Sequence, residues 1–291
     1  MLKRAIIAIL HLKGDTLLNR QPICAAIHDM SGFGRCSLSV IIPVISAMGI
    51  QCVPVPTAVL STHTGGFTGF VFRDMTDFIN PCREHYKKLG IKFNAIYSGF
   101  LASEAQVDSC LAFFEEFPEA IRIVDPVMGE DGVKYQTYTP ELVARMKELV
   151  HRADVITPNL TEASMLLDEK YPDKLTENDA RSWLERLCRM AGSAVITGIP
   201  LDSGKYANVC LDGKTGEYTL ICWEPLPASF PGTGDIFASV LTGKLIAGAS
   251  LSEAAEAATD FSHHAVEVTI DNGRPTRNGV EFERILSDLI K

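Results

Sequence analysis

A short run of small residues followed by an acid, Gly232-Thr233-Gly234-Asp235, leads directly into an apolar stretch that is typical of a helix. Free backbone N–H groups at such a helix start, together with the helix dipole, bind anions. They would suit a phosphoryl group that gains charge during transfer, and Asp235 could accept the proton of an attacking hydroxyl. The same residues could equally serve only to cap the helix, and this segment alone leaves both interpretations open.

Polar residues and glycines also follow the other apolar runs of the chain. These segments are 29–34, 61–66, 98–100, 125–132, 157–162 and 197–198. The apolar runs alternate with longer amphipathic ones, which indicates βαβ units and a mainly parallel sheet with helices on both faces. Ligands bind at the carboxyl ends of the strands in such sheets. The sequence therefore predicts an active site along this edge.

The expected elements form one α/β domain over residues 21–291, preceded by an extension at residues 1–20. Strands are expected at 22–28, 50–56, 94–98, 121–125, 153–157 and 194–197, with a hairpin at 206–211 and 217–222. Helices are expected at 36–48, 74–89, 103–117, 160–168, 177–190, 234–247, 251–268 and 280–290, and another begins at Pro140. Ser250 and Glu253 have the spacing of a capping box.

The composition excludes several classes of protein. With 46% hydrophobic and 22% charged residues in 291, the chain has the balance of a folded globular protein. Its net charge of −9 disfavours nucleic acid or an anionic membrane as a partner. No apolar stretch approaches the roughly 20 residues of a membrane span. The 8 cysteines have neither CxxC nor zinc spacing, which fits free thiols in a reducing cytoplasm.

Two common nucleotide-binding motifs do not explain the predicted site. The chain has no GxxxxGK[ST] sequence, which excludes a P-loop enzyme. Gly32-Phe33-Gly34 is similar to part of a dinucleotide fingerprint, but Ser37 stands at the third glycine position. No acid ends the second strand, so an NAD enzyme is disfavoured.

Four segments in a fixed order resemble the ribokinase-like (PfkB) family of small-molecule kinases, and within it the pyridoxal kinase branch. They are 61–65 (Ser-Thr-His-Thr-Gly), 125–129 (Asp-Pro-Val-Met-Gly), 157–162 (Thr-Pro-Asn-Leu-Thr-Glu) and 232–235 (Gly-Thr-Gly-Asp). The resemblance covers nearly the whole chain. It implies a ribokinase-like fold, and ATP-dependent phosphorylation of the 5-hydroxymethyl group of pyridoxal, pyridoxine or pyridoxamine in the cytoplasm.

The resemblance also assigns roles to the residues at the helix start. Asp235 matches the general base that activates the substrate's hydroxymethyl group. The N–H groups of Gly232, Thr233 and Gly234 match the hole that holds the γ-phosphate of ATP.

Further residues match positions around the metal and the nucleotide. Asp125 and Glu162 match the acids that organise Mg²⁺, directly or through water, and Mg²⁺ takes few carboxylates and keeps several waters. Asn159, Thr197 and Glu130 match positions near the ATP phosphates. The same resemblance makes K⁺ a plausible second cation, and a homodimer the expected assembly.

A third group of residues matches the substrate side of the site. His63 and Thr64 match the segment that lines the pyridine pocket. Phe100 stands where many relatives have a ring-stacking tyrosine, so it could stack on the ring without that hydroxyl. Asp29 could accept a hydrogen bond from a protonated pyridine nitrogen or an amino group, or it could form only an Asx-turn.

Alternative functions stay open on this scaffold. The pattern Asp29-x-Ser31-Gly32 resembles the hydroxymethylpyrimidine kinases, although those enzymes often have a cysteine after the catalytic aspartate, where this chain has Ile236. A sugar kinase is a second alternative. A ligand-binding relative without catalysis is a third, which the intact 232–235 segment and the two metal acids disfavour.

Overall fold

The computed structural model describes residues 21–290, so the extension expected at residues 1–20 lies outside the described residues. The strands are β1 (Ile23–Phe33), β2 (Gln51–Thr62), β3 (Phe72–Asp74), β4 (Ala95–Ser98), β5 (Ile121–Val124), β6 (Gly129–Glu130), β7 (Val133–Lys134), β8 (Val155–Ile156), β9 (Ser193–Pro200), β10 (Tyr206–Leu211) and β11 (Tyr218–Trp223). The helices are α2 (Leu38–Ala47), α3 (Thr76–Lys88), α4 (Glu104–Glu116), α5 (Pro140–Val150), α6 (Leu160–Leu167), α7 (Glu177–Cys188), α8 (Thr233–Ile246) and α9 (Leu251–Asp271), with 3₁₀ turns η1 (Thr276–Asn278) and η2 (Glu283–Leu289).

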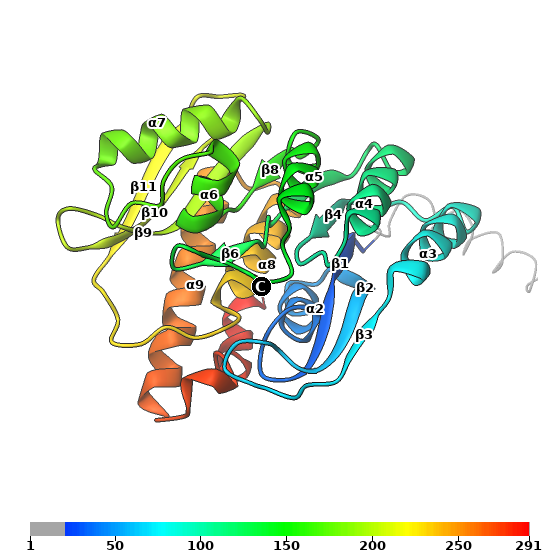
Figure 1. Ribbon diagram of the computed structural model, residues 1–291, viewed down its shortest axis with the longest axis horizontal. Coiled ribbons are helices and arrows are strands. Elements are labelled where there is room, and N and C mark those ends of the chain that lie inside the picture. The colour runs from blue at the N-terminus through cyan, green and yellow to red at the C-terminus, as the bar shows by residue number, and fades with distance from the viewer. Residues whose placement is uncertain (1–20, 291) are drawn as a thin grey trace, which may run out of the picture.

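The main sheet has the strand order β11-β10-β9-β8-β5-β4-β1-β2-β3. Its central strands, from β9 to β2, run parallel. The pairings at the edges, β9 with β10, β10 with β11 and β2 with β3, are antiparallel. The predicted α/β class with a mostly parallel sheet is confirmed, and so is the hairpin of β10 and β11. A short β6–β7 ribbon stands apart from this sheet (Figure 1).

Helices cover the sheet on both faces (Figure 1). Alternation along β1 explains the two layers, because Ala25 and Ile27 face one core while Cys24 and Ala26 face the other. Helices α3 to α7 contribute to the first core, and α2, α8 and α9 contribute to the second. Strands that are apolar on both faces are typical of parallel sheets buried between helices.

The first strands are longer than the sequence predicts. β1 continues through Asp29 and Ser31 to Phe33, with a register irregularity between His28 and Met30, and it pairs with β2 as far as Thr62. Residues expected in a loop after the first strand therefore belong to the sheet, because β2 supplies hydrogen-bond partners that the local sequence does not reveal.

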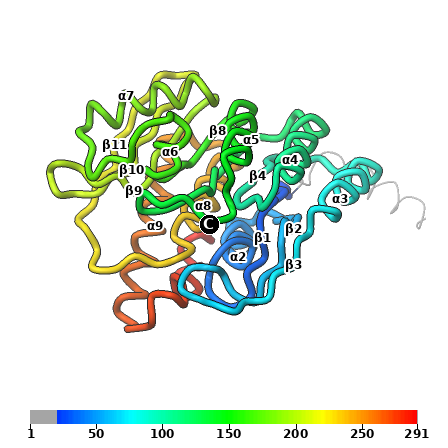
Figure 2. Tube along the Cα trace, in the orientation of Figure 1, coloured from blue at the N-terminus to red at the C-terminus, as the bar shows by residue number. Residues whose placement is uncertain are grey.

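The end of the chain also differs from expectation. Instead of an α-helix over 280–290, the structure has the 3₁₀ turn η2, whose Ile285 and Leu289 are buried in the core beside α2. Gly279 forms a bridge with Arg35, so the end of the chain lies beside the connection from β1 to α2 (Figure 2). Among residues 21–290, no helix is long and apolar enough to span a bilayer.

Candidate active site

The predicted anion-binding turn lies at the start of α8. Gly232 has φ of 89°, and a methyl group there would lie 1.9 Å from the Arg35 carbonyl oxygen, so only glycine fits. The Thr233 hydroxyl donates to the Phe230 carbonyl oxygen at 2.8 Å and fixes the turn. The first N–H groups of a helix have no intrahelical acceptor, and the space beside Gly234 is open to 4 Å. The turn can therefore receive an anion.

The replacement Gly232→Ala tests how tightly this turn is packed. Gly248 is the matched control, because its φ of 90° is similar but nothing lies within 4 Å of an added methyl group. We expect Gly248→Ala to lower the free energy of unfolding by about 1–2 kcal/mol, the cost of left-handed backbone, and Gly232→Ala to lower it further. Urea unfolding measures both, and equal losses would contradict the close packing of Gly232 against Arg35.

Asp235 projects from the first turn of α8 into a polar cluster. Its Oδ2 accepts the Ser37 N–H at 2.7 Å, and its Oδ1 lies 3.3 Å from His28 Nε2. Ser37 adopts φ of 59°, an uncommon conformation for serine that aims its N–H at this carboxylate. The geometry leaves Asp235 with fixed partners and only 12% side-chain exposure, beside the anion-binding turn.

Asp125 and Glu162 follow β5 and β8 at the same edge of the sheet. Burial and the nearby charge of Asp235 raise the pKa of Asp125 from 3.8 to about 7, against the opposing effects of His28 and a hydrogen bond from Thr157. Glu162 is 3% exposed, and burial and the charge of Asp125 raise its pKa too. Asp125 therefore lies within electrostatic reach of both Asp235 and Glu162.

Glu162 also holds the start of α6. Its Oε2 accepts the Asn159 N–H at 2.8 Å and its Oε1 accepts the Met128 N–H at 3.1 Å, while Asn159 Oδ1 accepts the Glu162 N–H. This capping box fixes the carboxylate against the segment that follows Asp125. These two N–H bonds favour the ionised carboxylate and so oppose the rise in the Glu162 pKa, although burial and the charge of Asp125 outweigh them.

These acids fit Mg²⁺ as an outer-sphere partner. Asp125 and Glu162 are buried carboxylates that have no cationic side chain among residues 21–290 as a direct partner, and a cation would offset their charge. Within residues 21–290, no group of His, Cys, Asp and Glu side chains is arranged to hold a metal by itself. Mg²⁺ keeps several waters and takes other ligands from substrate phosphates, so two carboxylates would suit an ion that arrives with the nucleotide.

The raised pKa of Asp125 predicts a pH-dependent stability. The folded protein keeps the Asp125 proton up to about pH 7, whereas the unfolded chain releases it near its ordinary pKa of 3.8. Stability conferred by this group is therefore present at low pH and is lost as the pH rises from about 4 to about 7.

Asp125→Asn should remove that loss. In metal-free buffer we expect the melting temperature of Asp125→Asn, relative to that of the wild type, to increase as the pH rises through this window. Thermal unfolding at several pH values measures this difference. Asp260→Asn, at an exposed position on α9, is the control. A difference between Asp125→Asn and wild type that does not change with pH would contradict the prediction.

The residues predicted near ATP lie around the same edge. Asn159 Nδ2 donates to the Gly129 carbonyl oxygen at 2.8 Å, and Asn159 forms a bridge with Thr197. Both ends of its side-chain amide are thus engaged within the protein, which makes it a support for the loop after β5. Glu130 lies on β6 with its pKa raised by burial and by Asp131, and its role toward the nucleotide stays a prediction.

Asp29 lies inside the polar cluster and not in a surface turn. Its Oδ1 accepts the Ser37 hydroxyl at 2.6 Å, and its Oδ2 accepts the Ser31 hydroxyl at 2.9 Å. Burial alone would raise the pKa of Asp29, but hydrogen bonds from His28, Ser37 and Ser31 lower it overall. The side chain is therefore an ionised acceptor within β1, beside its register irregularity.

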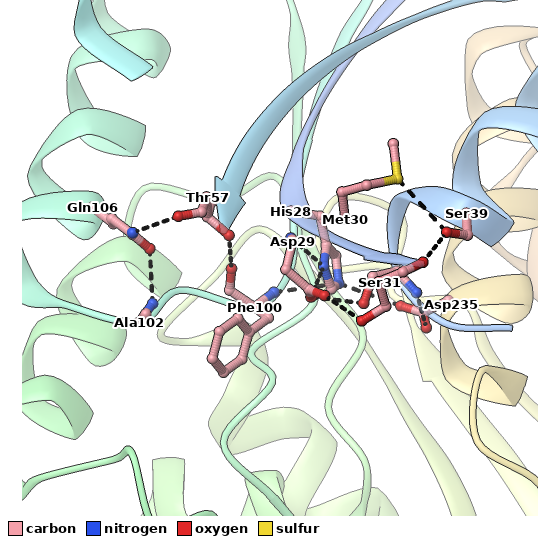
Figure 3. A network of polar contacts seen from close by, with 11 residues as sticks. His28, Asp29, Met30, Ser31, Ser39, Thr57, Phe100, Ala102, Gln106 and Asp235 are labelled. Carbon is pink, nitrogen blue, oxygen red and sulfur yellow. Dashed lines mark hydrogen bonds and ion pairs between the residues drawn. The ribbon is translucent and has the colours of Figure 1, made fainter. Parts of the chain in front are cut away.

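Phe100 is held in place from both sides of its backbone (Figure 3). Its N–H points at His28 Nε2, 3.3 Å away, and its carbonyl oxygen accepts the Thr57 hydroxyl at 3.0 Å. Gln106 bonds the Thr57 carbonyl oxygen and the Ala102 N–H, which extends the support to α4. Phe100 thus contacts the same His28 ring that Asp29 and Asp235 contact, and its stacking on a substrate ring stays a prediction.

His63 has a different environment from the one its predicted role suggests. Its ring is 5% exposed, with Nε2 at 2.8 Å from the Arg277 carbonyl oxygen and Nδ1 accepting the Gly65 N–H. The ring joins the segment after β2 to the C-terminal turn η1, and both nitrogens are engaged there. Thr64 next to it is exposed, so of these two residues Thr64 is the freer to meet a substrate.

Sequence reasoning missed two residues of the site, His28 and Ser37. A signal for His28 exists, because a histidine ends an otherwise apolar strand directly before Asp29. Ser37 has no sequence signal, since its contribution is a backbone N–H aimed by an unusual φ.

The sequence and the structure were compared with known protein families and solved structures. A sequence model of the phosphomethylpyrimidine kinase family matches residues 42–279. Among solved structures, a Bacteroides thetaiotaomicron protein named "putative phosphomethylpyrimidine kinase" is 38% identical, with 95% of this chain and 96% of that chain covered and a TM-score of 0.90. A second crystal form of that protein contains pyridoxal. Pyridoxal kinase from Lactobacillus plantarum is 29% identical, with 94% and 97% covered and a TM-score of 0.86.

The curated relatives include a pyrimidine kinase and a bifunctional enzyme of thiamine biosynthesis. A hydroxymethylpyrimidine/phosphomethylpyrimidine kinase of Bacillus subtilis is 29% identical over 66% of this chain and 70% of its own length. A chloroplastic thiamine biosynthetic bifunctional enzyme of Arabidopsis thaliana is 30% identical over 78% of this chain but only 43% of its own length. The chain spans about half the length of the first curated relatives it matches.

Proposed function

This chain belongs to the phosphomethylpyrimidine kinase family, and on that premise we propose that it phosphorylates the 5-hydroxymethyl group of pyridoxal, pyridoxine or pyridoxamine with ATP. The observation that carries the proposal is the position of Asp235, beside the anion-binding turn and joined through His28 to Asp29 and Phe100. A base between a phosphate site and an aromatic side chain suits a flat heteroaromatic alcohol. The pyridoxal found with the Bacteroides relative supports this choice of substrate.

In the proposed reaction, the hydroxymethyl oxygen forms a bond to the γ-phosphorus while its proton passes to Asp235. The bond from that phosphorus to the bridging oxygen breaks, and its electron pair leaves with ADP. The N–H groups of residues 232–234 donate to the phosphoryl oxygens as their charge grows. Asp29 accepts a hydrogen bond from the substrate ring, and Phe100 stacks on that ring.

Asp125 and Glu162 are the residues that would hold Mg²⁺, chiefly through its waters. When bound, the ion neutralises charge on the nucleotide phosphates. K⁺ dependence, a homodimer and a cytoplasmic location are further parts of the proposal that rest on the resemblance, and activity with and without K⁺ and light scattering test the first two.

A hydroxymethylpyrimidine kinase is the second candidate. The name of the matching family and the Bacillus subtilis relative favour it, as does Asp29, since a pyrimidine amino group could donate to this carboxylate as well as a pyridinium could. Ile236 after Asp235 stands where that branch often has a cysteine.

A substrate panel with the purified protein decides between the candidates. ADP release with Mg·ATP is measured for the three B6 vitamers, hydroxymethylpyrimidine and ribose, and mass spectrometry identifies the product. We expect the highest kcat/KM with a B6 vitamer. A higher kcat/KM with hydroxymethylpyrimidine would show that the protein is a hydroxymethylpyrimidine kinase instead. Binding of vitamers without ADP release would show a non-catalytic relative.

A further inference from the structure

The His28 ring lies between the two carboxylates of the site (Figure 3). Its Nδ1 is 2.9 Å from Asp29 Oδ1, and its Nε2 is 3.3 Å from Asp235 Oδ1. The side chain is 3% exposed, so water does not compete for either nitrogen. His28 therefore links Asp29 in β1 directly to Asp235 at the start of α8.

Two carboxylates beside one imidazole ring favour a proton on each ring nitrogen. A neutral imidazole has one N–H and can donate to only one carboxylate, so its other nitrogen would turn a lone pair toward negative oxygen. A doubly protonated ring donates to both Asp29 and Asp235. Burial alone would lower the pKa of His28, but the bonds to Asp235 and Asp29 raise it from 6.5 to about 10.

Other groups also contact the ring, among them the Asp29 backbone N–H, which points at Nδ1 from 2.9 Å. Tyr97 of β4 presents its ring edge-on at a centroid distance of 6.4 Å, and the charge of Asp125 acts across the site. The Phe100 N–H also points at Nε2. Contacts of a protonated ring with the carboxylates of Asp29 and Asp235 are stronger than these two contacts with neutral N–H groups, so both ring nitrogens are assigned as donors.

Gly99 is the residue that makes room for the ring. A methyl group at this position would lie 1.9 Å from Cδ2 and 2.1 Å from Nε2 of His28. Alanine could not be accommodated without displacing the imidazole, although the backbone there is not left-handed. The fold thus reserves space at the end of β4 for this side chain.

We propose that His28 is a positioning residue that joins the ring-binding carboxylate Asp29 to the base Asp235 by donating a hydrogen bond to each. The proposal rests on the proposed function, since it assigns Asp29 to the substrate ring and Asp235 to the hydroxyl. When the substrate ring donates a hydrogen bond to Asp29, His28 then fixes the position of Asp235, the carboxylate that must meet the hydroxymethyl group. Small displacements of a catalytic group cost about a hundredfold in rate.

Two amide variants separate the two bonds. His28→Asn places its amide near Nδ1 and can keep the bond to Asp29, whereas His28→Gln reaches toward the Nε2 position and can keep the bond to Asp235. We expect His28→Asn to lower kcat by about ten- to a hundredfold with a smaller change in KM for the vitamer. We expect His28→Gln to recover most of kcat and to raise KM.

Gly99→Ala is the complementary variant, because it displaces the ring without changing an ionisable group, and it should reproduce the loss of kcat. His264→Asn is the control, since His264 makes a half-exposed pair with Asp288 away from the site. Wild-type kcat in His28→Asn and in Gly99→Ala, or no recovery in a folded His28→Gln protein that binds ADP, would overturn the proposal.

A readout that needs no substrate separates this proposal from the proposed function. Nitrogen-15 NMR of the free wild-type protein at about pH 8, well above the ordinary histidine pKa, should show both His28 nitrogens protonated. A singly protonated ring would overturn the proposal even if the protein phosphorylates a vitamer. If the substrate panel shows no B6 activity, the protonated ring would still establish the link, and only its assigned substrate would change.

Discussion

Asp235→Asn is expected to lower kcat by about a thousandfold, in the range usual for loss of a general base, while ADP affinity stays unchanged. The amide has the shape of the carboxylate, and its oxygen can still accept the Ser37 N–H, which is 2.7 Å from Oδ2 in the wild type. It cannot accept a proton from the hydroxymethyl group. Steady-state kinetics and ADP titration calorimetry measure the two effects separately.

Asp29→Asn is a useful comparison, because it removes a second carboxylate from the same cluster. We expect it to raise KM for the vitamer more than it lowers kcat, since Asp29 is assigned to ring binding. Near-normal turnover in a folded Asp235→Asn protein would remove Asp235 from the mechanism and leave the 232–235 segment as a helix cap with an anion site.

Glu162→Gln is expected to have the second largest effect, on stability and activity together. Both Glu162 oxygens accept backbone N–H groups, from Asn159 and Met128. Glutamine offers one oxygen, so its NH₂ group would face an N–H donor and leave it unsatisfied, which costs about 1–3 kcal/mol. The loss of charge should also weaken Mg²⁺ binding, so the Mg²⁺ concentration at half-maximal activity should rise.

The chain supplies a matched control for this substitution. Glu253 occupies the same capping-box position at the start of α9, where its Oε2 accepts the Ser250 N–H at 2.8 Å. Glu253→Gln should lower stability slightly and leave the Mg²⁺ dependence unchanged. If Glu162→Gln changes only stability, as Glu253→Gln does, Glu162 is a structural cap and not a metal residue.

Much of this architecture could be predicted from the sequence because the information is local. The alternation of apolar runs and amphipathic runs indicates the parallel sheet, and the residues after each strand then fall at one edge. Asp125 and Glu162 could be placed at that edge on this basis, whereas Asp235, at a helix start, is joined to them by the family resemblance. Ser250 and Glu253 likewise form the predicted capping box.

The remainder depends on contacts between distant segments. Asp29 and Ser31 belong to β1 because β2 extends beside them to Thr62. The apolar residues from 280 to 289 have a spacing that fits an α-helix, yet packing beside α2 fixes them in a 3₁₀ turn. His28 acquires its role only when α8 brings Asp235 within reach, a contact between residues far apart in the sequence.

A crystal structure of the protein with pyridoxal, Mg²⁺ and a non-hydrolysable ATP analogue is the most direct test of the account. We expect the 5-hydroxyl oxygen within about 2.6–3.2 Å of an Asp235 carboxylate oxygen, with the γ-phosphate at the N–H groups of residues 232–234. A hydroxymethyl group that points away from Asp235, or a γ-phosphate bound elsewhere, would contradict the central claim.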